Sequence, residues 1–167
     1  VIVEIFIFIK YLIYGGFVMK VIALWGRSEV GKTSTLNMVI DILINELGAY
    51  KHLEYSADNE VDTRVVLKIN EKIIVVFTGG DDRRIMEENF DLVKSEQYDL
   101  LVCACRSRGA SCRSIEQRFS KDEIIWYGQG RVSGLKDKEE ELEMIRKQAN
   151  EYMARSIVQT AKTILSI

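Results

Sequence analysis

One glycine-bearing segment restricts the fold of this chain more than any other part of its sequence: Gly26-Arg27-Ser28-Glu29-Val30-Gly31-Lys32-Thr33. Residues 21–25, directly before it, form a short apolar run that is typical of a buried parallel strand. After it, apolar residues recur at helical spacing, at Leu36, Val39, Ile40, Leu43, Ile44 and Leu47. Gly48 follows where a glycine commonly ends a helix. The pattern predicts a strand, a glycine loop and an amphipathic helix in succession.

Two β-branched runs, residues 64–69 and 72–77, are separated only by Asn70 and Glu71. Such spacing predicts an antiparallel hairpin, in which Asn suits the turn better than Glu does. The polar stretch before the hairpin, residues 50–63, has no strong periodicity and predicts a loop. The second run is continuously apolar and predicts a central strand.

The rest of the chain alternates between strand and helix patterns. We expect a helix over 85–97, a buried strand over 99–105, a basic polar segment over 106–121, a short strand over 123–127 and a long amphipathic helix from residue 136 onward. The acidic run 139–141 suits a helix N-terminus. Together these elements predict an α/β fold of three layers, with a mostly parallel sheet and one antiparallel hairpin strand.

Composition narrows the class of protein further. The 167 residues are the length of one domain, and a net charge of −2 does not indicate a general nucleic-acid-binding protein. The three cysteines are an odd number without a secretory signal, which predicts reduced thiols in a cytoplasmic protein. Cys103 and Cys105 face the same way along a predicted strand and are expected in the core rather than at a metal. Trp126 and Tyr127 are likewise expected in the core.

The first 18 residues differ from the rest. They are largely apolar but are interrupted by Glu4 and Lys10, so they are too short and too charged to span a membrane. They also lack the pattern of a signal peptide. Because Gly15-Gly16 can be encoded by a ribosome-binding sequence shortly before Met19, we interpret residues 1–18 as an upstream extension and 19–167 as the domain. A weak membrane-binding or partner-binding helix is the alternative.

The 26–33 segment, with a strand before it and a helix after it, resembles the Walker A motif of P-loop NTPases. The resemblance implies a fold of that kind, with a nucleoside triphosphate and Mg²⁺ as ligands. The glycines let backbone N–H groups turn around phosphate oxygens, and the helix N-terminus favours an anion. Lys32 is expected to reach the β- and γ-phosphates, and the Thr33 hydroxyl to bind Mg²⁺. Nucleotide contacts are expected along Gly26, Arg27, Ser28, Glu29, Val30, Gly31, Lys32, Thr33 and Ser34.

The second motif of such proteins is only partly present. An apolar strand usually ends in an aspartate that holds Mg²⁺ through water, but Thr78 occupies that position here. Asp81 and Asp82 follow after two glycines. We expect Asp81 either to turn back toward the metal or to cap the next helix, since Asp also favours that position. Thr78 is a further candidate for the water shell of the metal.

Arginines follow the predicted strand 99–105. Arg106 and Arg108 come at the carboxyl end of that strand, where ligands bind in open α/β sheets. An arginine at such a place can neutralise charge on the phosphate being transferred. The alternatives are a solvated basic loop and a phosphate-positioning site without a role in catalysis.

Three functions remain open from the sequence. The first is an ATP hydrolase, which we favour; the second is a small-molecule or nucleotide kinase, with an acidic base from Asp81, Asp82 or the polar segment 55–62. The third is a GTPase-like switch or a nucleotide sensor without hydrolysis. ATP is expected over GTP because no Asn-Lys-x-Asp sequence follows the strand 99–105 to recognise guanine.

Overall fold

The computed structural model describes residues 19–56, 62–107, 109–134 and 136–167. The predicted extension 1–18 and the candidate Arg108 therefore lie outside the described residues. The strands are β1 (Lys20–Gly26), β2 (Tyr50–Ser56), β3 (Thr63–Ile69), β4 (Lys72–Phe77), β5 (Leu100–Arg106) and β6 (Ile124–Gly128). The helices are α2 (Lys32–Asn45), α3 (Arg83–Leu92), α4 (Ala110–Arg118) and α5 (Glu139–Leu165), with a 3₁₀ turn, η1 (Lys121–Glu123).

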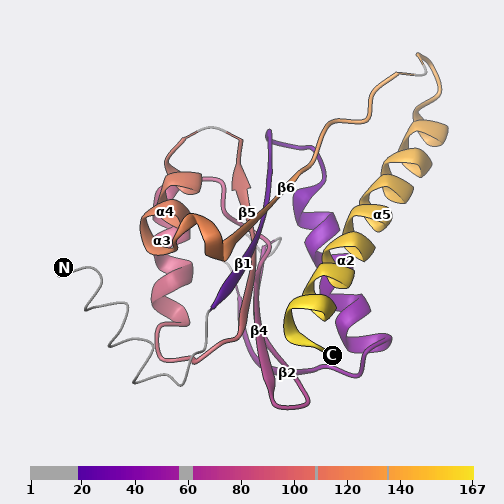
Figure 1. The fold of residues 1–167 in the computed structure, drawn as a ribbon. Helices are drawn as coiled ribbons and strands as arrows, with labels where there is room; N and C mark the ends of the chain where they lie inside the picture. Colours follow the sequence, from indigo (N-terminus) through magenta and orange to yellow (C-terminus); the bar gives the residue numbers. More distant parts are fainter. Residues whose placement is uncertain (1–18, 57–61, 108, 135) are drawn as a thin grey trace.

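The six strands form one sheet in the order β2-β3-β4-β5-β1-β6. β4, β5, β1 and β6 pair in parallel, whereas β3 is antiparallel to both of its neighbours. Helices α2 and α5 cover one face of the sheet, and α3 and α4 cover the other (Figure 1). The predicted α/β class, with a mostly parallel sheet and one strand that runs against the others, is confirmed.

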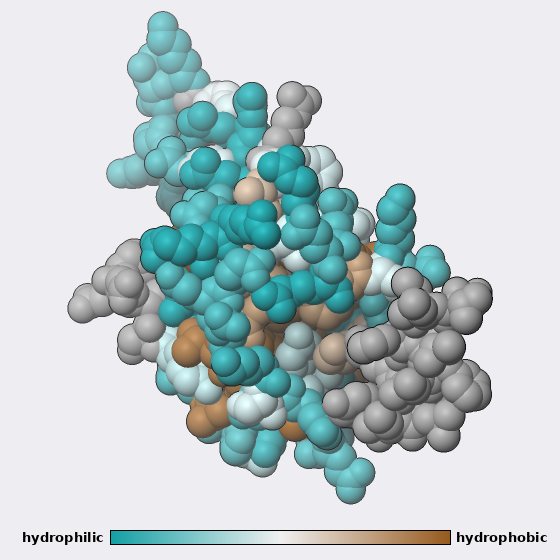
Figure 2. Space-filling view, turned by 90° about the vertical axis from the view of Figure 1, so that its left-hand side faces the viewer, coloured by the Kyte–Doolittle hydropathy of each residue, from teal (hydrophilic) through white to brown (hydrophobic). Residues whose placement is uncertain are grey.

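Alternation along the buried strands divides the core into two clusters. In β1, Ile22 and Leu24 face α2 and α5, while Val21 and Ala23 face α3 and α4. Hydrophilic residues cover most of the outer surface over α3 and α4, with hydrophobic patches among them (Figure 2). The apolar residues of both clusters therefore hold the central strands, and their carboxyl ends, in a fixed relation to one another.

The predicted loop over 50–63 is wrong for its first half, because β2 occupies Tyr50–Ser56 at the edge of the sheet. Among the side chains of this strand that the structure describes, the hydrophobic ones that pack against the core are Leu53 and Tyr55. An edge strand with two inward side chains carries too short an alternation to be recognised among polar residues. The hairpin itself is confirmed, and Asn70 takes the left-handed conformation of its turn (φ 53°).

The basic segment 106–121 also contains an element that the sequence did not reveal, α4. Its buried face consists of Ser111, Ser114 and Ile115, so only one aliphatic residue marks the helical period. The two serines are satisfied locally: Ser114 Oγ donates to the carbonyl oxygen of Ala110, and Ser111 Oγ accepts from the backbone N–H of Arg106. Small polar residues bonded to the backbone pack in this way without raising hydrophobicity.

Smaller corrections concern α3 and one aromatic side chain. α3 begins at Arg83 and ends at Leu92, earlier than the predicted 85–97. Trp126 is 39% exposed rather than in the core. β6 is an edge strand, and the core cluster on the side of α3 and α4 takes its strand residues mainly from β1, β3, β4 and β5. Cys103 and Cys105 are buried, as expected. Within the described ranges, no helix is both long and apolar enough to cross a membrane.

Candidate functional site

The 26–33 loop connects the carboxyl end of β1 to the first residue of α2. The neighbouring strand β5 leads into α4, which covers the opposite face of the sheet from α2. When connections from adjacent parallel strands diverge to opposite faces, a crevice opens between them at the carboxyl edge of the sheet. The loop therefore lies where an α/β sheet of this topology binds ligands.

Close contacts with the chain around them explain both glycines of the loop. A Cβ on Gly26 would lie 2.7 Å from the carbonyl oxygen of Gln129, and one on Gly31 would lie 2.7 Å from Oδ1 of Asn150. Gly31 also has a positive φ of 95° at the start of α2. Glu29 takes a left-handed conformation as well (φ 57°), which is uncommon for a residue with a Cβ. The loop is thus shaped by packing against β6 and α5 and holds backbone torsions of the kind found in anion-binding loops.

Lys32 is folded back inside this loop. Its side chain is only 7% exposed, and Nζ donates to the carbonyl oxygens of Arg27 at 2.6 Å and Gly26 at 3.2 Å. Burial lowers the pKa of Lys32 from its ordinary 10.5, although the nearby carboxylate of Asp81 acts in the opposite direction. In this position the ammonium group donates to neutral carbonyls, with the Asp81 carboxylate 3.9 Å away, and its burial has a desolvation cost that an anion in the crevice would offset.

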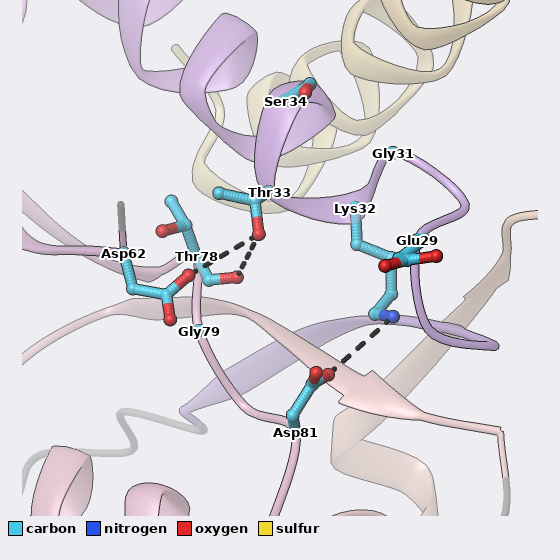
Figure 3. Close-up of a pocket in the computed structure, with 9 residues that line it drawn as sticks. All are labelled: Glu29, Gly31, Lys32, Thr33, Ser34, Asp62, Thr78, Gly79 and Asp81. Carbon is cyan, nitrogen blue, oxygen red and sulfur yellow. Dashed lines mark hydrogen bonds and ion pairs between the residues drawn. The ribbon is translucent and has the colours of Figure 1, made fainter. Parts of the chain in front are cut away.

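Oxygen atoms from three segments meet beside the first turn of α2 (Figure 3). Thr33 Oγ1 lies 3.4 Å from Oδ1 of Asp62 and 3.4 Å from the carbonyl oxygen of Thr78. The hydroxyl of Thr78 accepts from the backbone N–H of Thr63 at 2.7 Å, so this side chain ties β4 to β3 and offers its carbonyl to the site. In the sequence, Asp62 is one member of the polar segment 55–62, which is a candidate source of an acidic base. No motif around Asp62 predicts that it lies at the site.

The structure distinguishes the two aspartates after β4. Asp82 is the N-cap of α3, accepting from the backbone N–H of Ile85 at 2.9 Å, so the alternative that Asp81 caps this helix is wrong. Asp81 instead faces the loop, 3.9 Å from Nζ of Lys32, as Figure 3 shows. A Cβ on Gly80 would lie 1.9 Å from the carbonyl oxygen of Ala104. The glycine turn is therefore closely packed rather than flexible, and it directs Asp81 toward the crevice.

Arg106 reaches the same carboxylate from the end of β5. Its guanidinium group lies 3.4 Å from Oδ2 of Asp81, so this carboxylate stands between the two cationic groups of the site. The backbone N–H of Ser107 donates to the carbonyl oxygen of Gly26, which links the end of β5 to the 26–33 loop. Arg106 thus belongs to the site by position, whereas Arg108 lies outside the described residues.

Two adjoining cavities open around the loop. One, of about 330 Å³, is lined by Glu29, Gly31, Lys32, Thr33, Ser34, Asp62, Thr78, Gly79 and Asp81. The other, of about 540 Å³, shares Glu29, Gly31 and Ser34 with the first and extends between residues 129–132 and α5. Ser28 and Arg27 are exposed at the outer side of the loop. The loop therefore separates a small polar cavity from a larger one.

A buried glutamine supports the loop from behind. Nε2 of Gln129 lies within 3.0 Å of the carbonyl oxygen of Val30 and within 2.8 Å of Oδ1 of Asn150. It also lies 3.0 Å from Oγ1 of Thr35, in the first turn of α2. Gln129 follows β6 between two glycines, which was the only sequence signal for it, and Asn150 had no signal at all within its long helix. These contacts join β6 and α5 to the loop.

The oxygen atoms beside the first turn of α2 are of the type that Mg²⁺ prefers: a hydroxyl, a backbone carbonyl and the carboxylate of Asp62. Among the described residues, no group of three or more His, Cys, Asp and Glu side chains is arranged to hold a metal ion by protein ligands alone. A Mg²⁺ ion typically uses one or two carboxylates and completes its shell with water and substrate phosphates. The donor set therefore fits Mg²⁺ that arrives with a phosphate ligand.

Comparison with known protein families, with curated proteins and with solved structures finds no match to this chain.

Proposed function

We propose that the protein binds a nucleoside triphosphate, ATP rather than GTP, together with Mg²⁺ on the 26–33 loop of a P-loop fold and hydrolyses it. The observation that carries the proposal is the position of Lys32. Its buried ammonium group lies inside a glycine loop at the N-terminus of a helix whose first turn contains no acidic residue. A phosphate chain would replace the loop carbonyls as its partner, and the helix N-terminus would add backbone donors.

The metal would be held on the Thr33 side of the small cavity. Thr33 supplies a hydroxyl and Asp62 a carboxylate, and the two are already 3.4 Å apart. Mg²⁺ bound with the nucleotide supplies charge neutralisation on the phosphate oxygens. We therefore assign Asp62 to the metal site together with Thr33. The sequence predicts Thr33 and Asp81 as the residues that hold Mg²⁺.

Asp81 and Arg106 are placed for the reaction itself. Asp81 lies on the Lys32 side of the cavity, where the terminal phosphate is expected, and its carboxylate accepts a hydrogen bond from an attacking water and orients it. Arg106, freed from its contact with Asp81, donates to the charge that grows on the transferred phosphoryl group. Arg106 thus acts on charge that exists mainly in the transition state, whereas Asp81 positions the nucleophile.

The larger cavity gives the nucleoside a place. It adjoins the small one at Gly31 and Ser34, so a chain of phosphates along the loop would lead from one cavity to the other. Its volume of about 540 Å³ is in the range of small-molecule sites. Its polar lining consists of the side chains of Glu29, Ser34, Gln129, Arg131, Glu143, Arg146 and Asn150.

The test is phosphate release by the purified chain with Mg²⁺ and ATP, comparing the parent with Arg106→Ala. We expect the variant to keep its ATP affinity and to lose turnover, on the order of 10³-fold if Arg106 acts as an arginine finger in the same chain. Arg118→Ala is the matched control, because Arg118 lies on α4 over the Phe90 ring. Unchanged turnover in Arg106→Ala would show that Arg106 has no catalytic role. Transfer of phosphate to an added acceptor, without release to water, would indicate a kinase.

A further inference from the structure

Two thiols meet beside the candidate site. Cys105 is the last buried residue of β5, and Cys112 lies in the first turn of α4. Their Sγ atoms are 2.7 Å apart. Burial of Cys103 and Cys105 in the core does not explain why the sulfurs of Cys105 and Cys112 face each other.

The short connection between β5 and α4 brings the sulfurs together. Gly109 precedes α4 with a positive φ of 126°, a conformation that favours glycine. Ser111 Oγ accepts from the backbone N–H of Arg106, which fixes the first turn of α4 against the end of the strand. Sγ of Cys112 also lies 2.6 Å from the carbonyl oxygen of Arg106. The fold itself therefore holds the two sulfurs within contact distance of each other.

The two thiols differ in access and in acidity. Cys112 is partly exposed, whereas Cys105 is fully buried. The hydrogen bond between them lowers the pKa of Cys112 and, together with burial, raises the pKa of Cys105. Because the thiolate is the nucleophile, Cys112 is the thiol that an oxidant would meet first, and Cys105 is placed behind it.

We propose that Cys105 and Cys112 are a peroxide-sensitive thiol pair that closes to an intramolecular disulfide. In the first step the Cys112 thiolate attacks one oxygen of hydrogen peroxide; the S–O bond forms, the O–O bond breaks and the leaving hydroxide takes a proton to become water. In the second step Sγ of Cys105 attacks the sulfenic sulfur of Cys112, the S–S bond forms, and the departing hydroxide leaves as water with the Cys105 proton. Two thiols are oxidised and one peroxide is reduced to two waters.

The disulfide would enclose the segment that carries Arg106. The bond requires the sulfurs to approach from 2.7 Å to about 2.05 Å, and it removes the contact of the Cys112 thiol with the Arg106 carbonyl. The charge of either thiolate also raises the pKa of Lys32, so both sulfurs lie within electrostatic reach of the candidate site. The proposed modification therefore changes charge and backbone contacts at the edge of the crevice. Its chemistry needs no nucleotide and does not depend on the proposed function.

The experiment treats the full chain with hydrogen peroxide, blocks remaining thiols with an alkylating reagent and maps the products by mass spectrometry. We expect the loss of two hydrogens and a cross-link between the peptides of Cys105 and Cys112, reversed by dithiothreitol. Cys103→Ala is the control and should give the same cross-link, because Cys103 lies in the buried interior of β5. Cys105→Ala should stop at a sulfenic acid on Cys112, which dimedone traps.

Two results would overturn the proposal. One is a parent protein in which Cys112 remains free to alkylate after peroxide treatment. The other is oxidation of Cys112 beyond the sulfenic acid with no cross-link to Cys105, which would show that the buried thiol does not capture it. A circular dichroism spectrum of each variant shows whether it is folded. Cys112→Ser, which keeps the size of the side chain, should abolish the cross-link.

Discussion

At the scale of single residues, the proposed function depends most on Lys32. Its ammonium group is buried, and burial lowers its pKa below the ordinary 10.5. Only the protonated form attracts phosphate, and a bound phosphate raises the pKa again. The affinity for triphosphate should therefore have its full value below the pKa of Lys32 in the free protein, and it should fall as the pH rises through that pKa. Calorimetry with Mg²⁺ and ATP from neutral pH upward measures this, and affinity that stays constant up to pH 10.5 would contradict it.

The neighbouring aspartates allow a separation of stability from activity. Asp82→Ala should lower the free energy of unfolding by about 1 kcal/mol, because it removes the N-cap of α3, while ATP turnover stays close to that of the parent. Asp81→Ala should do the reverse, since the half-exposed pair with Arg106 contributes little to stability and the Lys32 ammonium group keeps its two carbonyl partners. Urea unfolding and phosphate release on both variants check this. Equal losses of stability would show that Asp81 also has a structural role.

At the scale of elements, β6 and α5 support the 26–33 loop and fix its shape at the start of α2. Gln129, which directly follows β6, bonds to Val30 of the loop, Thr35 of α2 and Asn150 of α5. Gln129→Ala would leave these buried groups without that partner, at a cost of about 1–3 kcal/mol. We expect a lower free energy of unfolding and weaker ATP binding together. Gln159→Ala, on the exposed side of α5, is the control. A variant with reduced stability but unchanged affinity would show that the loop keeps its shape without Gln129.

The elements also show what the sequence could and could not predict. The strand, loop and helix around residues 26–33 were predictable because hydrophobic periodicity is a local signal, and so was the hairpin around Asn70. β2 and α4 were missed, since an edge strand and a helix that buries serines carry little of that signal. Their tertiary packing supplies what the local pattern lacks.

At the scale of the whole molecule, the site combines residues that lie far apart in the sequence. Sheet order places β5 between β1 and β4, and Asp81, which follows β4, lies between Lys32 of the loop and Arg106 at the end of β5. Lys32 and Thr33 were predictable from their motif. Asp62, Gln129 and Asn150 were not, because only the pairing of β3 with β4 and the packing of α5 bring them to the loop. Which of two aspartates faced the site was likewise decided by the packing of Gly80.

The most direct test of the central claim is a calorimetric titration of Mg²⁺ and ATP into the parent chain and into Lys32→Ala. We expect a saturable site on the parent, no large preference for GTP, and binding that is strongly weakened in the variant. Lys51→Ala is the matched control, because Lys51 is an exposed lysine paired with Glu54 on β2, and it should bind as the parent does. Absence of triphosphate binding to the parent, or equal affinity in Lys32→Ala, would contradict the account.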